Sequence, residues 1–172
     1  LAFPTGSAGA PGVSGTTLGG GIGWIRRKHG LAVDALRSVE LVTADGAVRH
    51  LSAADDPDLF WGVRGAGHGL GVVTNFEFDC YEVGLSVGGL SVFYPWEAAD
   101  EVFAAVRGFV ADAPPAATII CNYAEIPAVP GMPPALHGEA AVALVGCYAG
   151  DPETGMEVFE PLRTVTDPLV DN

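Results

Sequence analysis

The groups most able to bind a ligand near the start of this chain belong to the backbone. The segment SGTTLGGGIGWIRRKHGL, residues 14–31, places four glycines within five positions and follows them with Trp24, Ile25 and a cationic run. Glycine loses more backbone entropy on folding than any other residue, so this cluster indicates a positive φ or a close backbone approach. Consecutive amides in such a turn can hold an anion without a lysine. The segment therefore predicts a ligand lying against bare main chain.

Ionisable side chains give weaker candidates for chemistry. Arg26, Arg27 and Lys28 adjoin the glycine run, and their clustering favours a solvated helix face over an anion site. The four histidines, at positions 29, 50, 68 and 137, share no metal-ligand spacing, so no metal site is predicted. His68 is the exception to set apart, because it interrupts a second glycine segment that could face the same ligand.

Several common catalytic and nucleotide motifs do not occur. Neither GGGIGW nor RGAGHGLG satisfies G-x-G-x-x-G, because the sixth positions are Trp24 and Leu70, and no apolar strand precedes the first run. A nicotinamide-dependent dehydrogenase would also need an acidic residue about 20 positions on, where only Glu40 is near. The chain has no P-loop, no HExxH motif and no G-x-S-x-G elbow. The absence of these motifs argues against the commonest phosphate-binding and hydrolytic folds.

The bulk composition is that of a globular protein. The 172 residues are 49% hydrophobic and 17% charged, with a formal net charge of −13. That charge repels a phosphate backbone and an anionic lipid surface, so nucleic acid and membrane partners are not expected. No apolar span approaches the roughly 20 residues of a membrane helix. We expect a soluble protein, with the cytoplasm favoured, and the start at LAFPTG without Met suggests a piece of a longer chain.

The three cysteines give no sign of a disulfide framework. Cys80, Cys121 and Cys147 are widely spaced, form no CxxC pair and lie in apolar runs. Buried free thiols are therefore predicted at all three positions.

The first half of the chain predicts few regular elements. Residues 1–23 are too rich in glycine for a helix, whereas WIRRKHG predicts a short helix that ends at Gly30. Residues 38–51 predict a hairpin with an Asp45-Gly46 turn. Asp56 and Pro57 predict the start of a short helix that buries Leu59, Phe60 and Val63. Residues 72–80 alternate as a half-buried strand, with one face formed by Val72, Thr74, Phe76, Phe78 and Cys80.

After about residue 84 the pattern becomes regular. We predict a strand at 90–94, a helix from Pro95 to about Val110, a strand at 118–126, a proline-rich linker at 127–138 and a strand at 141–148. A helix begins at the Asp151-Pro152 cap and carries Met156, Phe159 and Leu162. The tail from Thr164 predicts no further element. This β-α-β-β-α order indicates an α+β domain, with a boundary at residues 82–86.

The segments PTG, GVSGTTLGGGIGWIRRKHGLAVDAL, VTADG and DPDLFWGVRGAGHGLGVVTNFEF together resemble a known family. The family is the vanillyl-alcohol-oxidase/PCMH superfamily, specifically the berberine-bridge-enzyme-like oxidoreductases, and the resemblance covers about residues 2–80. It implies an α+β fold: the C-terminal half of a PCMH-type FAD-binding domain at 1–83, then the start of an α+β substrate domain at 84–172. The second match is less specific than the first.

The resemblance also implies the cofactor and the residues that hold it. In that family, glycine loops run beside an elongated FAD, and main-chain N–H groups bond the pyrophosphate and the isoalloxazine. The residues that match the loop at the flavin ring and pyrophosphate are Pro4, Thr5, Gly6, Gly12, Val13, Gly15, Thr16, Leu18, Gly19, Gly20, Gly21 and Gly23. Those that match the stretch holding the adenine end are Gly71, Val72 and Val73.

Some positions depart from the family pattern. The family's R-G-G-G-G-N-F-G stands here as residues 64–71, RGAGHGLG, with His68 at a glycine position. Ala8 occupies the place of the cysteine that attaches to flavin C6 in bicovalent members, so a cysteinyl link is not expected. The histidine that attaches at C8α belongs to an earlier half-domain and has no counterpart here. Pro11 lies where the family tunes oxygen access.

The resemblance implies an FAD-linked oxidoreductase in which hydride passes from a substrate carbon to flavin N5 and electrons then pass to oxygen or another acceptor. The substrate is a small molecule that the sequence does not identify, and no catalytic residue is assigned. Packing is the default role of Tyr94, Tyr123 and Glu125. A cofactor site of which this piece holds only one part exposes apolar surface that the complete enzyme covers. This piece alone is therefore expected to be inactive, to bind FAD weakly and to be able to form homo-oligomers. The alternative is a flavin-free scaffold or interaction module that retains the fold.

Overall fold

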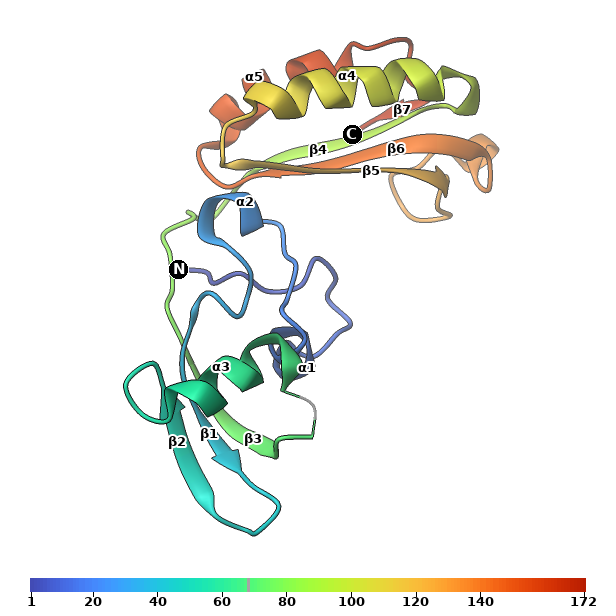
Figure 1. The fold of residues 1–172 in the computed structure, drawn as a ribbon. Helices are drawn as coiled ribbons and strands as arrows, with labels where there is room; N and C mark the ends of the chain where they lie inside the picture. Colours follow the sequence, from blue (N-terminus) through green and yellow to red (C-terminus); the bar gives the residue numbers. More distant parts are fainter. Residues whose placement is uncertain (68) are drawn as a thin grey trace. The chain divides into compact units, whose positions relative to one another are not determined.

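The computed structural model describes residues 1–67 and 69–172 and has an α+β fold. The chain divides into two compact units, Leu1–Val83 and Gly84–Asn172, at the point where the glycine loops of the sequence give way to regular elements. Figure 1 shows the elements of each unit in chain order. The prediction at His68 lies outside the described residues.

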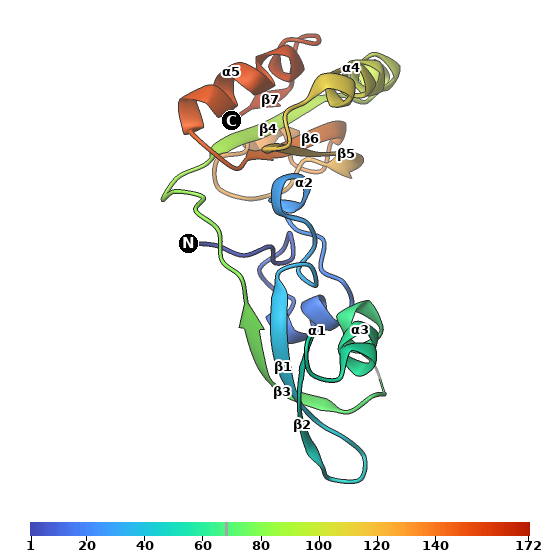
Figure 2. The same ribbon diagram turned by 60° about the vertical axis from the view of Figure 1, so that its left-hand side comes forward.

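The first unit is built on a three-stranded antiparallel sheet with the order β2-β1-β3. Its strands are β1 (Leu36–Val42), β2 (Val48–Ser52) and β3 (Val72–Phe78), and its helices are α1 (Val13–Leu18), α2 (Arg26–His29) and α3 (Pro57–Ala66). Figure 2 shows α1 and α3 next to each other beside this sheet. The core of the unit consists of Leu36, Val39, Leu41, Leu51, Phe60 and Val63.

Local capping and turn signals account for three of these elements. The predicted hairpin is confirmed, with the amide of Gly46 donating to the Thr43 carbonyl at 2.9 Å. The predicted start of α3 is also confirmed, because the Asp56 carboxylate accepts from the Leu59 amide and Pro57 occupies the first turn. The end of α2 is at Gly30, whose φ of +80° is the left-handed conformation that favours glycine.

The expectation that residues 1–23 contain no helix is wrong. Residues 13–18 form the helix α1, which has no side-chain cap. Its last residue, Leu18, packs against the core cluster that contains Phe60 and Val63, and Thr17 is 1% exposed. Tertiary packing therefore stabilises a helix that local propensity disfavours.

The predicted inward face of β3 is wrong at its start. Val73, Phe76 and Phe78 pack against the core, whereas Val72 is 68% exposed. The pairing with β1 shifts register between Glu40 and Leu41, and such a bulge moves the following side chains to the opposite face. The strand ends at Phe78, so alternation does not continue to Cys80.

The prediction of a buried thiol is wrong for Cys80, which is exposed. Cys121 and Cys147 are half-buried. Burial raises the pKa of the Cys121 thiol to about 11 and also raises the pKa of the Cys147 thiol. Both groups are therefore protonated and weakly nucleophilic at neutral pH.

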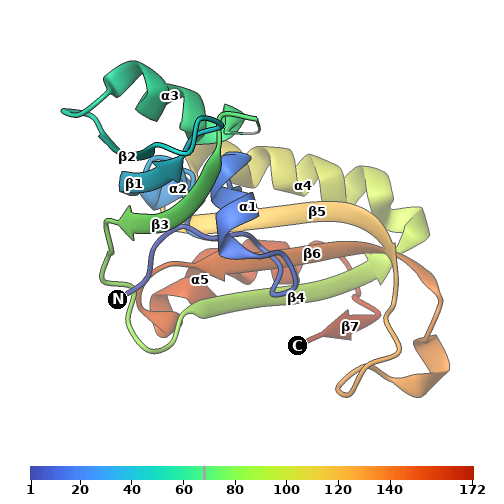
Figure 3. The same ribbon diagram turned by 90° about the horizontal axis from the view of Figure 1, so that it is seen from below.

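The second unit is a four-stranded antiparallel sheet covered on one face by two helices. Its strands are β4 (Gly88–Pro95), β5 (Ala117–Glu125), β6 (Ala140–Tyr148) and β7 (Val170–Asp171), in the order β5-β6-β4-β7 seen in Figure 3. The helices are α4 (Ala99–Asp112), preceded by the 3-10 turn η1 (Trp96–Ala98), and α5 (Pro152–Arg163). A second 3-10 turn, η2 (Pro134–Leu136), lies in the proline-rich linker. The predicted element order is confirmed.

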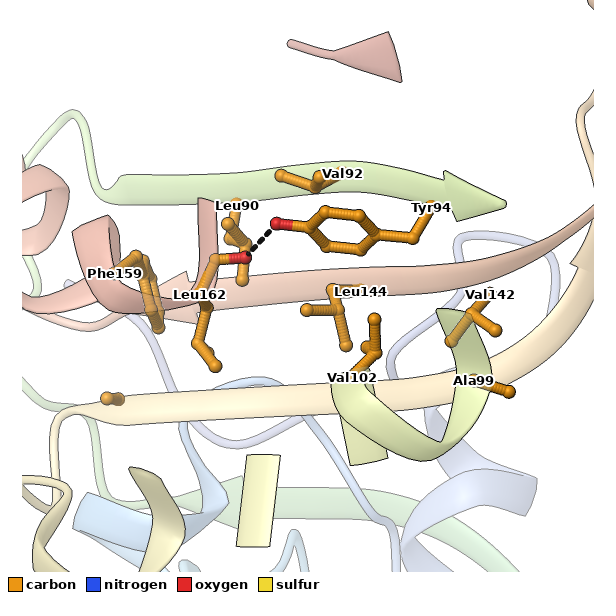
Figure 4. Close-up of a cluster of buried hydrophobic side chains, with 10 residues drawn as sticks. Leu90, Val92, Tyr94, Ala99, Val102, Val142, Leu144, Phe159 and Leu162 are labelled. Carbon is orange, nitrogen blue, oxygen red and sulfur yellow. Dashed lines mark hydrogen bonds between the residues drawn. The ribbon is translucent and has the colours of Figure 1, made fainter. Parts of the chain in front are cut away.

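The core of the second unit lies between the helices and the sheet (Figure 4). Tyr94 is fully buried there and donates its hydroxyl to the Leu162 carbonyl at 2.8 Å, which joins β4 to α5. Burial raises the pKa of the Tyr94 hydroxyl. The predicted cap of α5 is confirmed, since the Asp151 carboxylate accepts from the Thr154 amide at 2.8 Å.

The expectation of a tail without structure is wrong. Residues 170 and 171 pair with β4 as the strand β7, and Arg163 of α5 forms an ion pair with Asp171. Arg163 also donates to the Gly89 carbonyl at 3.1 Å. Pairing across more than 70 residues leaves no local signal in the tail. Among the helices of the described residues, none is both long and apolar enough to cross a membrane.

Candidate cofactor site

The first predicted segment, residues 4–23, lies on the surface of the first unit as a loop, the helix α1 and a glycine turn. Pro4 and Thr17 are buried, whereas most side chains from Thr5 to Gly15 are exposed. The segment contains no ionisable side chain. It can therefore bind a ligand through its backbone and apolar groups, but it cannot exchange a proton with one.

The second predicted segment, residues 71–73, lies on the sheet. A Cβ at Gly71 would overlap the Val42 carbonyl of β1, and Val73 packs against the core of the first unit. Leu18 of α1 belongs to the periphery of the same core, together with Leu70. The structure thus joins the end of α1 and the start of β3 through one apolar cluster.

Some of the predicted glycines are required by packing within the chain. A Cβ at Gly21 would overlap Ala32, and a Cβ at Gly23 would overlap the backbone carbonyl of Thr5. Nothing beyond the chain itself is needed to explain glycine at these two positions or at Gly71. The sequence does not separate these packing glycines from ligand-facing ones.

Other glycines have no such reason. A Cβ at Gly12 or Gly15 would meet no atom within 4 Å, and neither residue has a positive φ. Gly9, which sequence reasoning did not single out, is open in the same way. Gly20 is also open, but its φ of +107° favours glycine. Gly9, Gly12 and Gly15 are all exposed, so a ligand that lay against the main chain there would meet no side chain from these three positions.

The glycine turn itself uses some of its amides internally. Gly19 donates to the Gly15 carbonyl at 3.1 Å and Gly20 donates to the Thr17 carbonyl at 3.0 Å. Those two amides are therefore engaged in this conformation and do not form a free anion nest. The carbonyls of Gly20 and Gly21 accept from Val33 and Ala32, which fixes the turn against the following segment.

Three side chains near the turn make contacts that the sequence does not predict. The hydroxyl of Thr17 is buried and has no hydrogen-bond partner among the described residues. The His29 ring stacks on Tyr81 with 4.1 Å between ring centroids. Burial, and to a lesser degree the charge of Lys28, lowers the pKa of His29, so its imidazole is neutral at pH 7. Arg26 is half-buried and donates to the Gly23 carbonyl at 2.9 Å.

The cavities of the second unit do not coincide with the predicted site. One groove of about 540 Å³ lies between α4 and α5 and is lined by residues that include Phe109, Val158 and Leu162. Another, of about 390 Å³, is lined by residues that include Trp96, Glu97 and Glu139.

The two tyrosines among the acid–base candidates of the second unit have packing roles, whereas the glutamate lies on the surface. Tyr94 is held in the core, and Tyr123 packs against Trp96 and Phe103. Glu125 ends β5 on the surface. No catalytic base is assigned among the described residues.

Comparison with known proteins finds a family match within the first unit. Residues 1–52 match the family model described as an FAD binding domain. The FAD-linked oxidoreductase azaG of Aspergillus niger is 35% identical over 164 residues, which are 94% of this chain and 33% of that protein.

Two solved structures have the same fold as this chain. Wild-type BBE-like 1 of Physcomitrella patens matches with a TM-score of 0.80 and 25% identity, covering 99% of this chain and 35% of that one. The xylooligosaccharide oxidase of Myceliophthora thermophila C1, in complex with xylobiose, matches with a TM-score of 0.75 and 27% identity. The match covers 97% of this chain and 33% of that one. The chain spans about a third of the length of these proteins.

Proposed function

We propose that this chain carries part of an FAD-binding domain of the PCMH type found in berberine-bridge-enzyme-like oxidoreductases. From that premise, it forms one wall of the FAD site of a flavin-linked oxidase or dehydrogenase. The observation that carries the proposal is the set of open glycines, Gly9, Gly12 and Gly15, on an exposed surface without ionisable groups.

The proposed role of residues 4–23 is to bind and orient. FAD, when bound, supplies a two-electron acceptor for a hydride from a substrate carbon. The segment from Pro4 to Gly15 has only small or uncharged side chains between its glycines, and it would offer mainly backbone groups and hydroxyls to the ligand. The turn at Gly19, Gly20, Gly21 and Gly23 is proposed to set the edge of this surface. Thr5, Gly6, Val13, Thr16 and Leu18 complete this surface, with Gly71, Val72 and Val73 assigned to the adenine end.

The second unit is proposed to be the start of the substrate domain. In support, the match to the xylooligosaccharide oxidase, which was solved with xylobiose, covers 97% of this chain and so includes the second unit. We propose a small organic molecule as the substrate and oxygen or another acceptor as the electron sink. Because the segment at the cofactor has no acid or base, the proton-transfer group must come from outside residues 4–23.

A flavin-free scaffold is the second candidate, since Gly21, Gly23 and Gly71 are explained by internal packing alone. Gly89 and Gly108 of the second unit are open in the same way as Gly9, Gly12 and Gly15, so open glycines alone do not exclude a scaffold. The flavoprotein is favoured because Gly9, Gly12 and Gly15 lie in the segment that matches the FAD binding domain.

The full-length protein that contains this chain is expected, when purified, to show the visible absorbance bands of bound flavin and to release FAD on denaturation. The test is an absorbance spectrum before and after unfolding, with thermal unfolding recorded in the presence and absence of added FAD. A colourless protein whose unfolding temperature does not rise with FAD would support the scaffold instead.

A further inference from the structure

The loop formed by residues 5–12 makes few contacts with the rest of the described chain. It lies between the buried Pro4 and the helix α1, and most of its side chains are exposed. Cβ atoms built at Gly9 and Gly12 would meet no neighbour within 4 Å. A loop with so little packing needs specific anchors to keep one conformation.

Two consecutive residues of the glycine turn provide such anchors. The Trp24 indole N–H donates to the Ser7 carbonyl at 3.1 Å across 17 residues of sequence. The backbone of Gly23 lies so close to Thr5 that any Cβ would overlap the Thr5 carbonyl. The loop is therefore held at Thr5 and at Ser7 by neighbouring positions of one segment.

The segment that carries these anchors is itself fixed on both sides. Arg26 donates to the Gly23 carbonyl at 2.9 Å, and Ala32 donates to the Gly21 carbonyl at 2.9 Å. Trp24 is half-buried and directly follows Gly23, the residue whose carbonyl Arg26 holds. The indole N–H is thus a donor carried by a backbone segment that hydrogen bonds hold in place. A group that positions a flexible loop needs such support.

We propose that Trp24 is a positioning residue that holds loop 5–12 in the conformation that receives the flavin ring. The proposal rests on the proposed function. Trp24 acts through Ser7, so its role is to reduce the freedom of the loop before the ligand binds. Phenylalanine at this position keeps the aromatic packing but lacks the N–H donor.

The test compares the full-length protein that contains this chain with its Trp24→Phe variant, using alanine methyl labels. The Ala8 and Ala10 methyl groups report the loop, and Ala32 and Ala35, both buried, report the folded core. We expect the order parameters of Ala8 and Ala10 to fall from about 0.85 to below about 0.6, with those of Ala32 and Ala35 unchanged. Trp61→Phe is the matched control, because Trp61 is 77% exposed on α3.

FAD affinity supplies the second readout. Loss of one neutral hydrogen bond predicts about a fivefold higher Kd for FAD in Trp24→Phe and no change in Trp61→Phe. Unchanged loop order parameters would overturn the anchoring role, and a loosened loop with unchanged FAD affinity would overturn the positioning role. If neither protein binds FAD, the proposed function fails, and the positioning of the flavin ring fails with it.

Discussion

Replacing Gly23 with alanine is expected to destabilise the first unit by about 3 kcal/mol and to abolish FAD binding. The new Cβ would overlap the backbone carbonyl of Thr5, and a carbonyl cannot rotate away as a side-chain end can. Relief requires the glycine turn and the start of loop 5–12 to separate. The separation would also strain the hydrogen bonds that Trp24 and Arg26 make at this point.

Chemical denaturation of the purified Gly23→Ala protein measures this effect. Gly9→Ala is the matched control, because its Cβ would meet nothing within 4 Å and its stability is expected to change by less than about 0.5 kcal/mol. Equal stability of the two variants would show that the close approach of Gly23 to Thr5 does not hold the loop.

Replacing Gly15 with alanine is expected to change stability and cofactor affinity in opposite directions. Gly15 lies inside α1 with open space around its Cα, so alanine stabilises the helix by about 0.5–1 kcal/mol. If the flavin lies against this backbone, the same methyl group pushes it away. We expect the Kd for FAD to rise at least about tenfold, which corresponds to roughly 1.4 kcal/mol.

The control for this variant is Gly108→Ala. Gly108 also lies within a helix, α4, with no atom near its Cβ position, but it belongs to the second unit. Thermal unfolding and an FAD titration of both variants separate the two effects. A Gly15→Ala protein that gains stability and binds FAD with unchanged affinity would remove the open glycines as support for a flavin site.

Local signals account for the elements that could be predicted from the sequence. Asp56 with Pro57, Asp151 with Pro152, and the Asp45-Gly46 turn each specify an element boundary within a few residues, and the structure has all three. The outward Val72 and the strand β7 could not be found in this way. The orientation of Val72 depends on a bulge in the pairing of β3 with β1, and β7 depends on pairing with β4 at the edge of the sheet. Both partner strands are distant in sequence.

The candidate site shows the same division. The glycine pattern and the family resemblance predict a position for the site, and that position stays a prediction, but they do not distinguish the separate roles of the glycines. Gly23 and Gly15 look alike in sequence, and only the placement of Thr5 makes one of them a packing residue. The helix α1 was missed because Leu18 packs against a core cluster that runs from Leu36 to Val63, which is distant in sequence.

Titration of FAD into the alanine-methyl-labelled protein tests most directly whether the flavin lies against residues 4–23. The account predicts that the resonances of Ala8 and Ala10 shift with the added FAD, whereas those of Ala105 and Ala140, which line the two grooves of the second unit, do not. Shifts at Ala105 or Ala140 with Ala8 and Ala10 unmoved would contradict it.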